Sequence, residues 1–131
     1  MLNKENAIKI IEDINLPLNE YWVTSGAALV IHGVKSATND VDLGCTTKLL
    51  EELIEAGHQY KIEDDGLRTF TMNDSVELFE NWFVSKIEIV EGIPVGSIES
   101  IKKQKMLLGR EKDFIDIKII DDYIEKFLKA K

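Results

Sequence analysis

Thr24-Ser25-Gly26-Ala27-Ala28-Leu29-Val30-Ile31-His32-Gly33 and Asn39-Asp40-Val41-Asp42-Leu43 are the two segments that decide the fold of this 131-residue chain. The residues from Tyr21 to Thr24 favour a strand, and the Ser25-Gly26 turn leads into a short buried helix that ends at Gly33. After a polar loop, residues 40–44 favour a second strand. This order of strand, turn, helix and strand is typical of a domain that packs helices against a sheet.

The two aspartates of the second strand are candidate metal ligands. Alternate residues of a strand project from the same face, so Asp40 and Asp42 can direct two carboxylates to one point while Val41 faces the interior. Carboxylate oxygens are the ligands that Mg²⁺ prefers. The Ser25-Gly26 turn at a helix start offers free backbone N–H groups to a phosphate. A metal site beside a phosphate site suggests nucleotide chemistry.

Glu77 is the candidate for a third acid, because it is a lone carboxylate in the otherwise apolar segment Val76-Glu77-Leu78-Phe79. If its strand lies beside the strand of Asp40 and Asp42, three acids would hold one or two metal ions and position an in-line attack on a phosphoryl group. The plainer alternative is that Glu77 points to solvent from a wet face of the sheet. The register of its strand decides between the two.

The rest of the chain alternates helical and strand patterns. Helices are predicted at residues 4–15, 46–56, 97–108 and 111–128, and short strands at 59–62, 67–72, 76–79 and 87–90, with 94–96 as an extended link. The last helix is expected to bury a broad apolar stripe made of Phe114, Ile115, Ile117, Ile120, Tyr123, Ile124 and Phe127. We therefore expect one α/β or α+β domain over residues 1–131, with a mixed sheet of about five strands and helices packed on one face.

Composition narrows the class of protein. The chain is 44% hydrophobic and 31% charged, which is typical of a folded globular domain, and its net charge of −8 argues against binding to duplex nucleic acid. Its apolar runs are too short to cross a bilayer. The single Cys45 and a first segment without signal-peptide character favour the reducing cytoplasm. Cys45 itself is expected to be a small buried residue rather than a nucleophile.

These motifs carry a resemblance to a known family. The run from Ser25 to Gly33 followed by Asn39-Asp40-Val41-Asp42-Leu43 resembles the signature of the nucleotidyltransferase superfamily related to DNA polymerase beta. The segment Lys105 to Asp116 is similar to the closing segment of small bacterial members near the lincosamide nucleotidyltransferases and abortive-infection toxins. The resemblance covers the order of elements over most of the chain, with specific motif residues in about three short segments.

The resemblance implies roles for individual residues. Ser25 and Gly26 would hold nucleotide phosphate, and Asp40, Asp42 and Glu77 would ligate Mg²⁺. The sequence departs from the family pattern in having Ser-Gly where Gly-Gly or Gly-Ser is usual, and Glu where the third acid is usually Asp. An acidic protein must counter the charge of a triphosphate locally, so Lys105, Arg110 and Lys112 are candidate phosphate contacts, with an ordinary charged surface as the alternative. Trp82-Phe83, in a loop between strands, is either core or part of a substrate cleft.

The leading hypothesis is Mg²⁺-dependent transfer of a nucleoside monophosphate from an NTP, such as ATP, to an unidentified small-molecule or protein acceptor. The competing hypothesis is a noncatalytic nucleotide-binding or regulatory module of the same fold, within a toxin-antitoxin or phage-defence pair. A phosphoryl hydrolase that uses the same acids is a third. The sequence leaves open whether the chain forms a homodimer or binds a protein partner.

Overall fold

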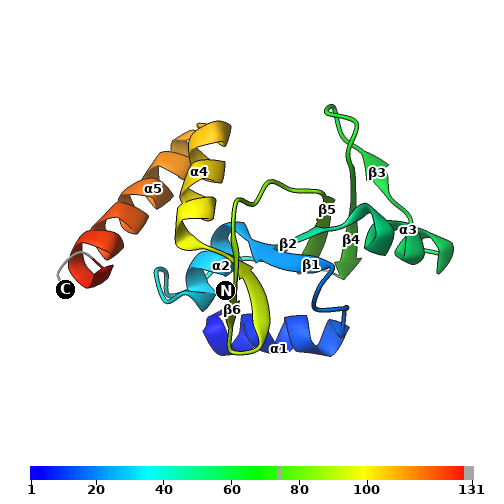
Figure 1. The fold of residues 1–131 in the computed structure, drawn as a ribbon, viewed down its shortest axis with the longest axis horizontal. Coiled ribbons are helices and arrows are strands. Elements are labelled where there is room, and N and C mark those ends of the chain that lie inside the picture. Colours follow the sequence, from blue (N-terminus) through cyan, green and yellow to red (C-terminus); the bar gives the residue numbers. More distant parts are fainter. Residues whose placement is uncertain (74, 129–131) are drawn as a thin grey trace.

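The computed structural model describes residues 1–73 and 75–128 as helices and strands around one mixed sheet (Figure 1). The predicted elements are present within a few residues of their expected bounds. In chain order the elements are α1 (Lys4–Ile14), β1 (Tyr21–Thr24), α2 (Ser25–Ile31), β2 (Val41–Cys45), α3 (Thr47–Glu55), β3 (Lys61–Ile62), β4 (Arg68–Asn73), β5 (Val76–Glu80), β6 (Ile87–Val90), β7 (Ile93–Gly96), α4 (Ile98–Leu108), α5 (Glu111–Tyr123) and the π-helix η1 (Ile124–Leu128).

The sheet has seven strands in the order β3-β4-β5-β2-β1-β7-β6. Strand β2 pairs antiparallel with β1 and parallel with β5, while β1 pairs parallel with β7. The α/β class is confirmed, but the expected count of about five strands is too low. The segment predicted as an extended link is strand β7, because Pro94 and Gly96 weaken a strand pattern without preventing pairing next to β1.

One face of the central strands carries the apolar core. Val23 of β1, Leu43 of β2 and Leu78 of β5 are fully buried there, and they belong to one cluster with residues of α1, α2 and α3. On the same strands, the side chains that point to the opposite face of the sheet include Thr24, Asp42 and Glu77. Because α1, α2 and α3 pack against the apolar face, this polar face is available for a site.

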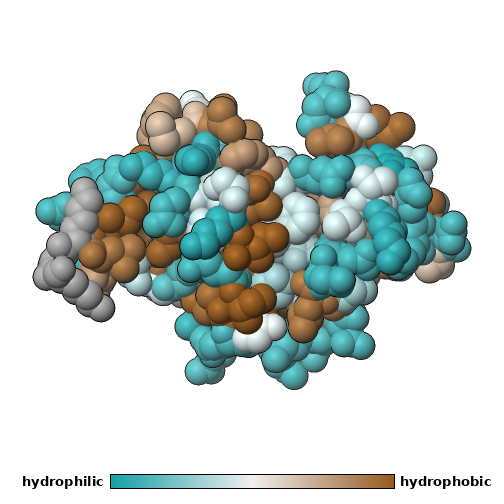
Figure 2. Space-filling model, in the orientation of Figure 1, coloured by the Kyte–Doolittle hydropathy of each residue, from teal (hydrophilic) through white to brown (hydrophobic). Residues whose placement is uncertain are grey.

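The two C-terminal helices are less buried than the sequence predicts. Helices α4 and α5 lie side by side at one end of the molecule (Figure 1). Of the predicted stripe only Ile120 is fully buried, whereas Phe114 is 58% and Ile115 61% exposed, so that prediction is wrong over part of the helix. Figure 2 shows apolar surface over this hairpin, whose exposed apolar residues are Met106, Leu107, Leu108, Phe114 and Ile115.

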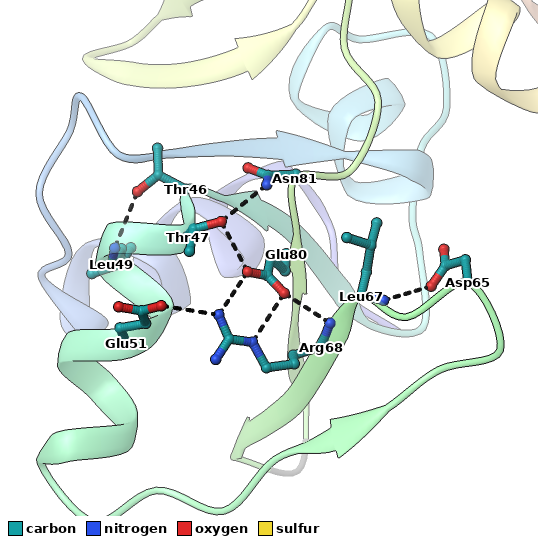
Figure 3. Close-up of polar contacts among 9 residues, drawn as sticks. All are labelled: Thr46, Thr47, Leu49, Glu51, Asp65, Leu67, Arg68, Glu80 and Asn81. Carbon is teal, nitrogen blue, oxygen red and sulfur yellow. Dashed lines mark hydrogen bonds and ion pairs between the residues drawn. The ribbon is translucent and has the colours of Figure 1, made fainter.

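A polar cluster ties α3 to β4 and β5 (Figure 3). The buried Glu80 carboxylate accepts hydrogen bonds from the Arg68 guanidinium, at 2.8 and 3.0 Å, and from the Thr47 hydroxyl at 2.9 Å. Cys45 lies buried in the same layer, and burial, followed by the charge of Glu80, raises its pKa to about 12. Cys45 is therefore the small buried residue that was expected, and its thiol stays protonated.

In residues 1–73 and 75–128, none of the helices combines the length and the apolar character that crossing a membrane requires.

Candidate functional site

A pocket of about 280 Å³ lies on the polar side of the sheet, where the end of β1 and the start of β2 meet α4 and α5. Ser25, Gly26, Asp40 and Asp42 line it from the sheet side. The cationic residues of the α4 and α5 region that line it are Lys105, Arg110 and Lys112. Seven of the eight residues proposed from the sequence as metal or phosphate contacts, all except Glu77, therefore share one pocket.

The Ser25-Gly26 turn makes a sharp connection from β1 to α2. Ser25 has a φ of +58°, which lies in the left-handed region that side chains rarely adopt. Gly26 is required for a different reason, because a Cβ at this position would lie 2.7 Å from the Thr38 hydroxyl oxygen. The backbone of this turn is thus packed against the loop that leads to Asp40.

Asp42 and Glu77 occupy paired positions on the parallel strands β2 and β5, so their side chains leave the sheet on the same face. Asp40 immediately precedes β2 and lines the same pocket as Asp42. Burial, and then the charges of Asp40 and Glu77, raise the pKa of Asp42 to about 6. The carboxylates of Asp40 and Glu77 are therefore both close enough to Asp42 to disfavour its charged form.

Glu77 differs from the two aspartates in where its side chain lies. It lines a separate pocket with Tyr60, Lys61 and Thr71 and not the one lined by Asp40 and Asp42. Within residues 1–73 and 75–128, no group of three or more His, Cys, Asp or Glu side chains is arranged to hold a metal ion. Asp40 and Asp42 supply the hard oxygen donors that suit Mg²⁺, and a cation would offset both the burial and the carboxylate repulsion that raise the pKa of Asp42. The assignment of Glu77 as a third ligand stays a prediction.

Lys105 and Arg110 line the pocket, but each is already held by a carboxylate. The Lys105 ammonium is 2.8 Å from a carboxylate oxygen of Asp116 and 3.7 Å from one of Asp113. The Arg110 side chain donates two hydrogen bonds, of 2.7 and 3.1 Å, to Asp113. Lys112 lines the pocket and makes no ion pair with any residue that the structure describes. A bound phosphate would therefore share Lys105 and Arg110 with the carboxylates of Asp113 and Asp116 in α5.

Three residues of the pocket were not singled out as functional by the sequence. Lys35, in the loop after α2, lies 3.1 Å from Asp116, and both residues line the pocket together with Asp113. Counted together, the lining holds four acidic side chains (Asp40, Asp42, Asp113, Asp116) and four basic ones (Lys35, Lys105, Arg110, Lys112). The spacing of Asp113 and Asp116 by three residues, one helical turn apart, was the available signal, because it places both on one face of a helix that already follows two cationic candidates.

An aromatic wall, made by Phe79 and Trp82, borders both this pocket and a second one. Phe79 and Trp82 have ring centroids 4.8 Å apart and line both the first pocket and a neighbouring pocket of about 380 Å³. Gln104 holds this region in place, since it accepts a hydrogen bond from Thr24 and donates one to the backbone oxygen of Phe83. Of the predicted Trp82-Phe83 pair, Trp82 thus lines the cleft.

Sequence comparison identifies no relative: no family model and no curated protein matches the chain. Solved structures do match in fold. One is a Thermotoga maritima protein described as a candidate nucleotidyltransferase, which superposes with a TM-score of 0.64 at 15% identity and covers 99% of this chain and 97% of its own.

Two antibiotic-related structures also match. ANT(2″)-Ia, solved with adenylyl-2″-tobramycin, has a TM-score of 0.53 at 17% identity and covers 92% of this chain and 86% of its own. The lincosamide antibiotic adenylyltransferase LnuA, solved with lincomycin, matches more weakly, with a TM-score of 0.44 at 18% identity over 89% of this chain and 96% of its own. The likeness to the first two shows that this chain has the nucleotidyltransferase fold.

Proposed function

We propose that the chain is a Mg²⁺-dependent nucleotidyltransferase that moves a nucleoside monophosphate from an NTP to an acceptor hydroxyl. The observation that carries the proposal is the meeting of Asp40 and Asp42 with the Ser25-Gly26 turn in one pocket that Lys105, Arg110 and Lys112 also line. A metal-ion site next to basic side chains suits a triphosphate, because both balance its negative charge. The nucleotidyltransferase fold of the chain is consistent with this use.

In the proposed reaction the acceptor oxygen forms a bond to the α-phosphorus as the bond to the β-phosphate oxygen breaks, and pyrophosphate leaves. Asp40 and Asp42 would hold Mg²⁺, which would neutralise the charge that develops on the phosphate oxygens. Ser25 and Gly26 would lie against the phosphates, with Lys105 and Arg110 opposite. The proton of the acceptor hydroxyl passes to a pocket carboxylate or to water.

The acceptor is proposed to be a small molecule that docks in the second pocket. This pocket shares Phe79 and Trp82 with the first, so a molecule lying there reaches the same aromatic wall. Glu63, Asp64 and Asp65 contribute carboxylates to its lining, which would favour a hydroxyl-bearing acceptor that also carries positive charge. ANT(2″)-Ia was solved with an adenylylated antibiotic, and a small-molecule acceptor of that general kind fits this proposal.

Nucleotide-dependent thermal stabilisation tests the proposal without knowledge of the acceptor. The four NTPs are compared with and without Mg²⁺ on the wild type and on Asp42→Asn. Stabilisation by at least one NTP that needs both Mg²⁺ and Asp42 is expected, because a ligand that binds only the folded state raises its stability. Equal stabilisation of both proteins would contradict the metal assignment.

The matched control is Asp121→Asn, which makes the same chemical change at a half-exposed position of α5 outside the pocket. It should respond to NTP and Mg²⁺ as the wild type does. Transfer itself is then followed by release of pyrophosphate from the stabilising NTP in the presence of candidate acceptors. Release of inorganic phosphate instead would identify a phosphoryl hydrolase.

A noncatalytic binding module of the same fold is the second candidate, and one observation favours it. The hairpin of α4 and α5 exposes large apolar side chains, including Leu107 at 75% and Ile115 at 61% exposure, as expected of a surface that contacts another protein. Mg²⁺-dependent NTP binding without pyrophosphate release in any acceptor mixture would favour this candidate over the enzyme.

A further inference from the structure

Asp116 lies between two lysines that come from different parts of the fold. One of its carboxylate oxygens is 3.1 Å from the ammonium of Lys35, and the other is 2.8 Å from the ammonium of Lys105. Lys35 belongs to the loop between α2 and β2, and Lys105 to the last turn of α4. A single carboxylate of α5 therefore joins the two sides of the pocket.

The burial of these groups makes the arrangement well defined. The side chain of Lys105 is 5% exposed and that of Asp116 is 14% exposed, while that of Lys35 is 26% exposed. Burial raises the pKa of Asp116, but the hydrogen bonds and charges of Lys105 and Lys35 outweigh burial, so the pKa lies below its ordinary value. Asp116 is therefore ionised at neutral pH and holds both ammonium groups.

The lysine side chains of this pocket depend on carboxylates to fix their positions. Arg110 is held by Asp113 through two side-chain hydrogen bonds, whereas Lys35 has Asp116 as its ion-pair partner within the described residues. A lysine side chain has four rotatable bonds, and fixing it in place costs conformational entropy. If that cost is met during folding, a ligand that needs the ammonium group binds more tightly.

We propose that Asp116 is a positioning residue that fixes the Lys35 and Lys105 ammonium groups at the pocket wall, where both contact the phosphate oxygens of the nucleotide. This inference rests on the proposed function, and it adds Lys35 as a phosphate contact that acts through the same carboxylate as Lys105. A purely structural alternative exists, in which the two ion pairs only fasten the loop after α2 to α5.

Binding of inorganic tripolyphosphate in the presence of Mg²⁺ tests this proposal, because that probe carries no nucleoside and requires no transfer. Asp116→Asn keeps the size of the side chain and removes its charge. We expect its Kd for tripolyphosphate, measured by calorimetry at constant salt, to rise about tenfold, as when a charge-assisted contact is lost. Lys35→Gln should weaken binding to a similar degree, and it replaces the most exposed of the three side chains.

A double-mutant cycle on Asp116 and Lys35 distinguishes a role in positioning the lysines from a role in fastening the loop. In the Lys35→Gln background, Asp116→Asn should weaken binding less than it does alone, because one of the two lysines that it positions is already absent. Asp121→Asn is the matched control, since Asp121 also joins α5 to α4, through a 2.6 Å ion pair with Lys102 outside the pocket. Its Kd should equal that of the wild type.

Several outcomes would overturn the proposal. An unchanged Kd in Asp116→Asn or Lys35→Gln would assign the ion pairs to loop fastening, and a tighter Kd in Asp116→Asn would make Asp116 a competitor of phosphate. Fully additive effects would remove the link between the two residues, and a wild type that does not bind tripolyphosphate would remove the phosphate site. If the probe binds with the expected pattern while no NTP yields pyrophosphate, the positioning role stands and the transferase proposal fails.

Discussion

Asp42 of β2 and Glu77 of β5 are direct neighbours across a parallel strand pair, in the register that also pairs Val41 with Val76 and Leu43 with Leu78. The apolar pairs fill the core, so the two acids must leave the opposite face together. Burial of Asp42, followed by the charges of Asp40 and Glu77, raises its pKa from 3.8 to about 6. The site therefore destabilises the metal-free fold at neutral pH.

Asp42→Asn is expected to stabilise the protein in a metal chelator at pH 7. The raised pKa means that the folded state binds the proton more tightly than the unfolded state, so stability falls as pH rises from about 4 to about 6. After allowance for solvent screening, the gain from removing the charge is about 1 kcal/mol. Urea denaturation in EDTA at pH 4 and pH 7 measures it, and a gain of the same size at both values would contradict the electrostatic explanation.

Ser25→Gly should also stabilise the protein. Ser25 has a φ of +58°, which is strained for a residue with a side chain but unstrained for glycine. The larger entropy of glycine in the unfolded chain offsets part of this gain, so we expect a net increase of about 0.5 kcal/mol. Ser36→Gly is the control, because Ser36 is exposed and has no positive φ, and it should lower stability slightly. A loss of stability in both variants would show that Ser25 is unstrained.

Local patterns in the sequence predict much of this fold and part of its site. The alternation around Asp40, Val41 and Asp42 predicts which side chains leave the sheet together, and the pocket contains both acids. Helix starts follow from capping residues such as Thr46 and Ser97, whose side chains accept the hydrogen bonds expected of them. These features depend on neighbouring residues alone, which is why a single sequence reveals them.

Contacts between distant segments could not be predicted in the same way. The pairing of Lys35 with Asp116 joins residues 81 positions apart, and no local pattern indicates it. The exposure of Phe114 and Ile115 likewise depends on how α5 packs against α4, which the apolar content of the helix does not reveal. Strand β7 was missed because its pairing with β6 and β1, rather than its composition, makes it a strand.

Gly44→Ala is predicted to destabilise the protein through Trp22. The two residues are paired on β2 and β1, and a Cβ at position 44 would overlap the indole ring of Trp22, which is 9% exposed. The ring would have to move out of a close-packed position, at a cost of about 2 kcal/mol. Chemical denaturation measures the loss, and a shift in tryptophan emission should accompany it.

Replacement of Trp22 by a smaller side chain tests the cause of that loss. In a Trp22→Leu background, Gly44→Ala should cost much less, because the overlapping ring is absent. An undiminished cost would show that the backbone of β2, rather than Trp22, requires glycine at this position.

Acid should weaken the link between α3 and strands β4 and β5 through Glu80. The hydrogen bonds from the Arg68 side chain, which outweigh burial, lower the pKa of Glu80 from 4.5 to about 2. A lowered pKa means that the stabilisation is complete above about pH 4.5 and is lost as pH falls toward 2. Glu80→Gln should therefore cost about 2 kcal/mol at pH 7, since it leaves a guanidinium with a weaker partner.

Chemical denaturation between pH 7 and pH 2 measures this effect. The difference in the free energy of unfolding between Glu80→Gln and wild type should shrink as the pH falls to 2. Glu55→Gln, at an exposed position of α3, is the control and should follow the wild-type profile throughout. A constant difference between Glu80→Gln and wild type from pH 7 to pH 2 would show that the shape of the side chain, rather than its charge, holds this cluster together.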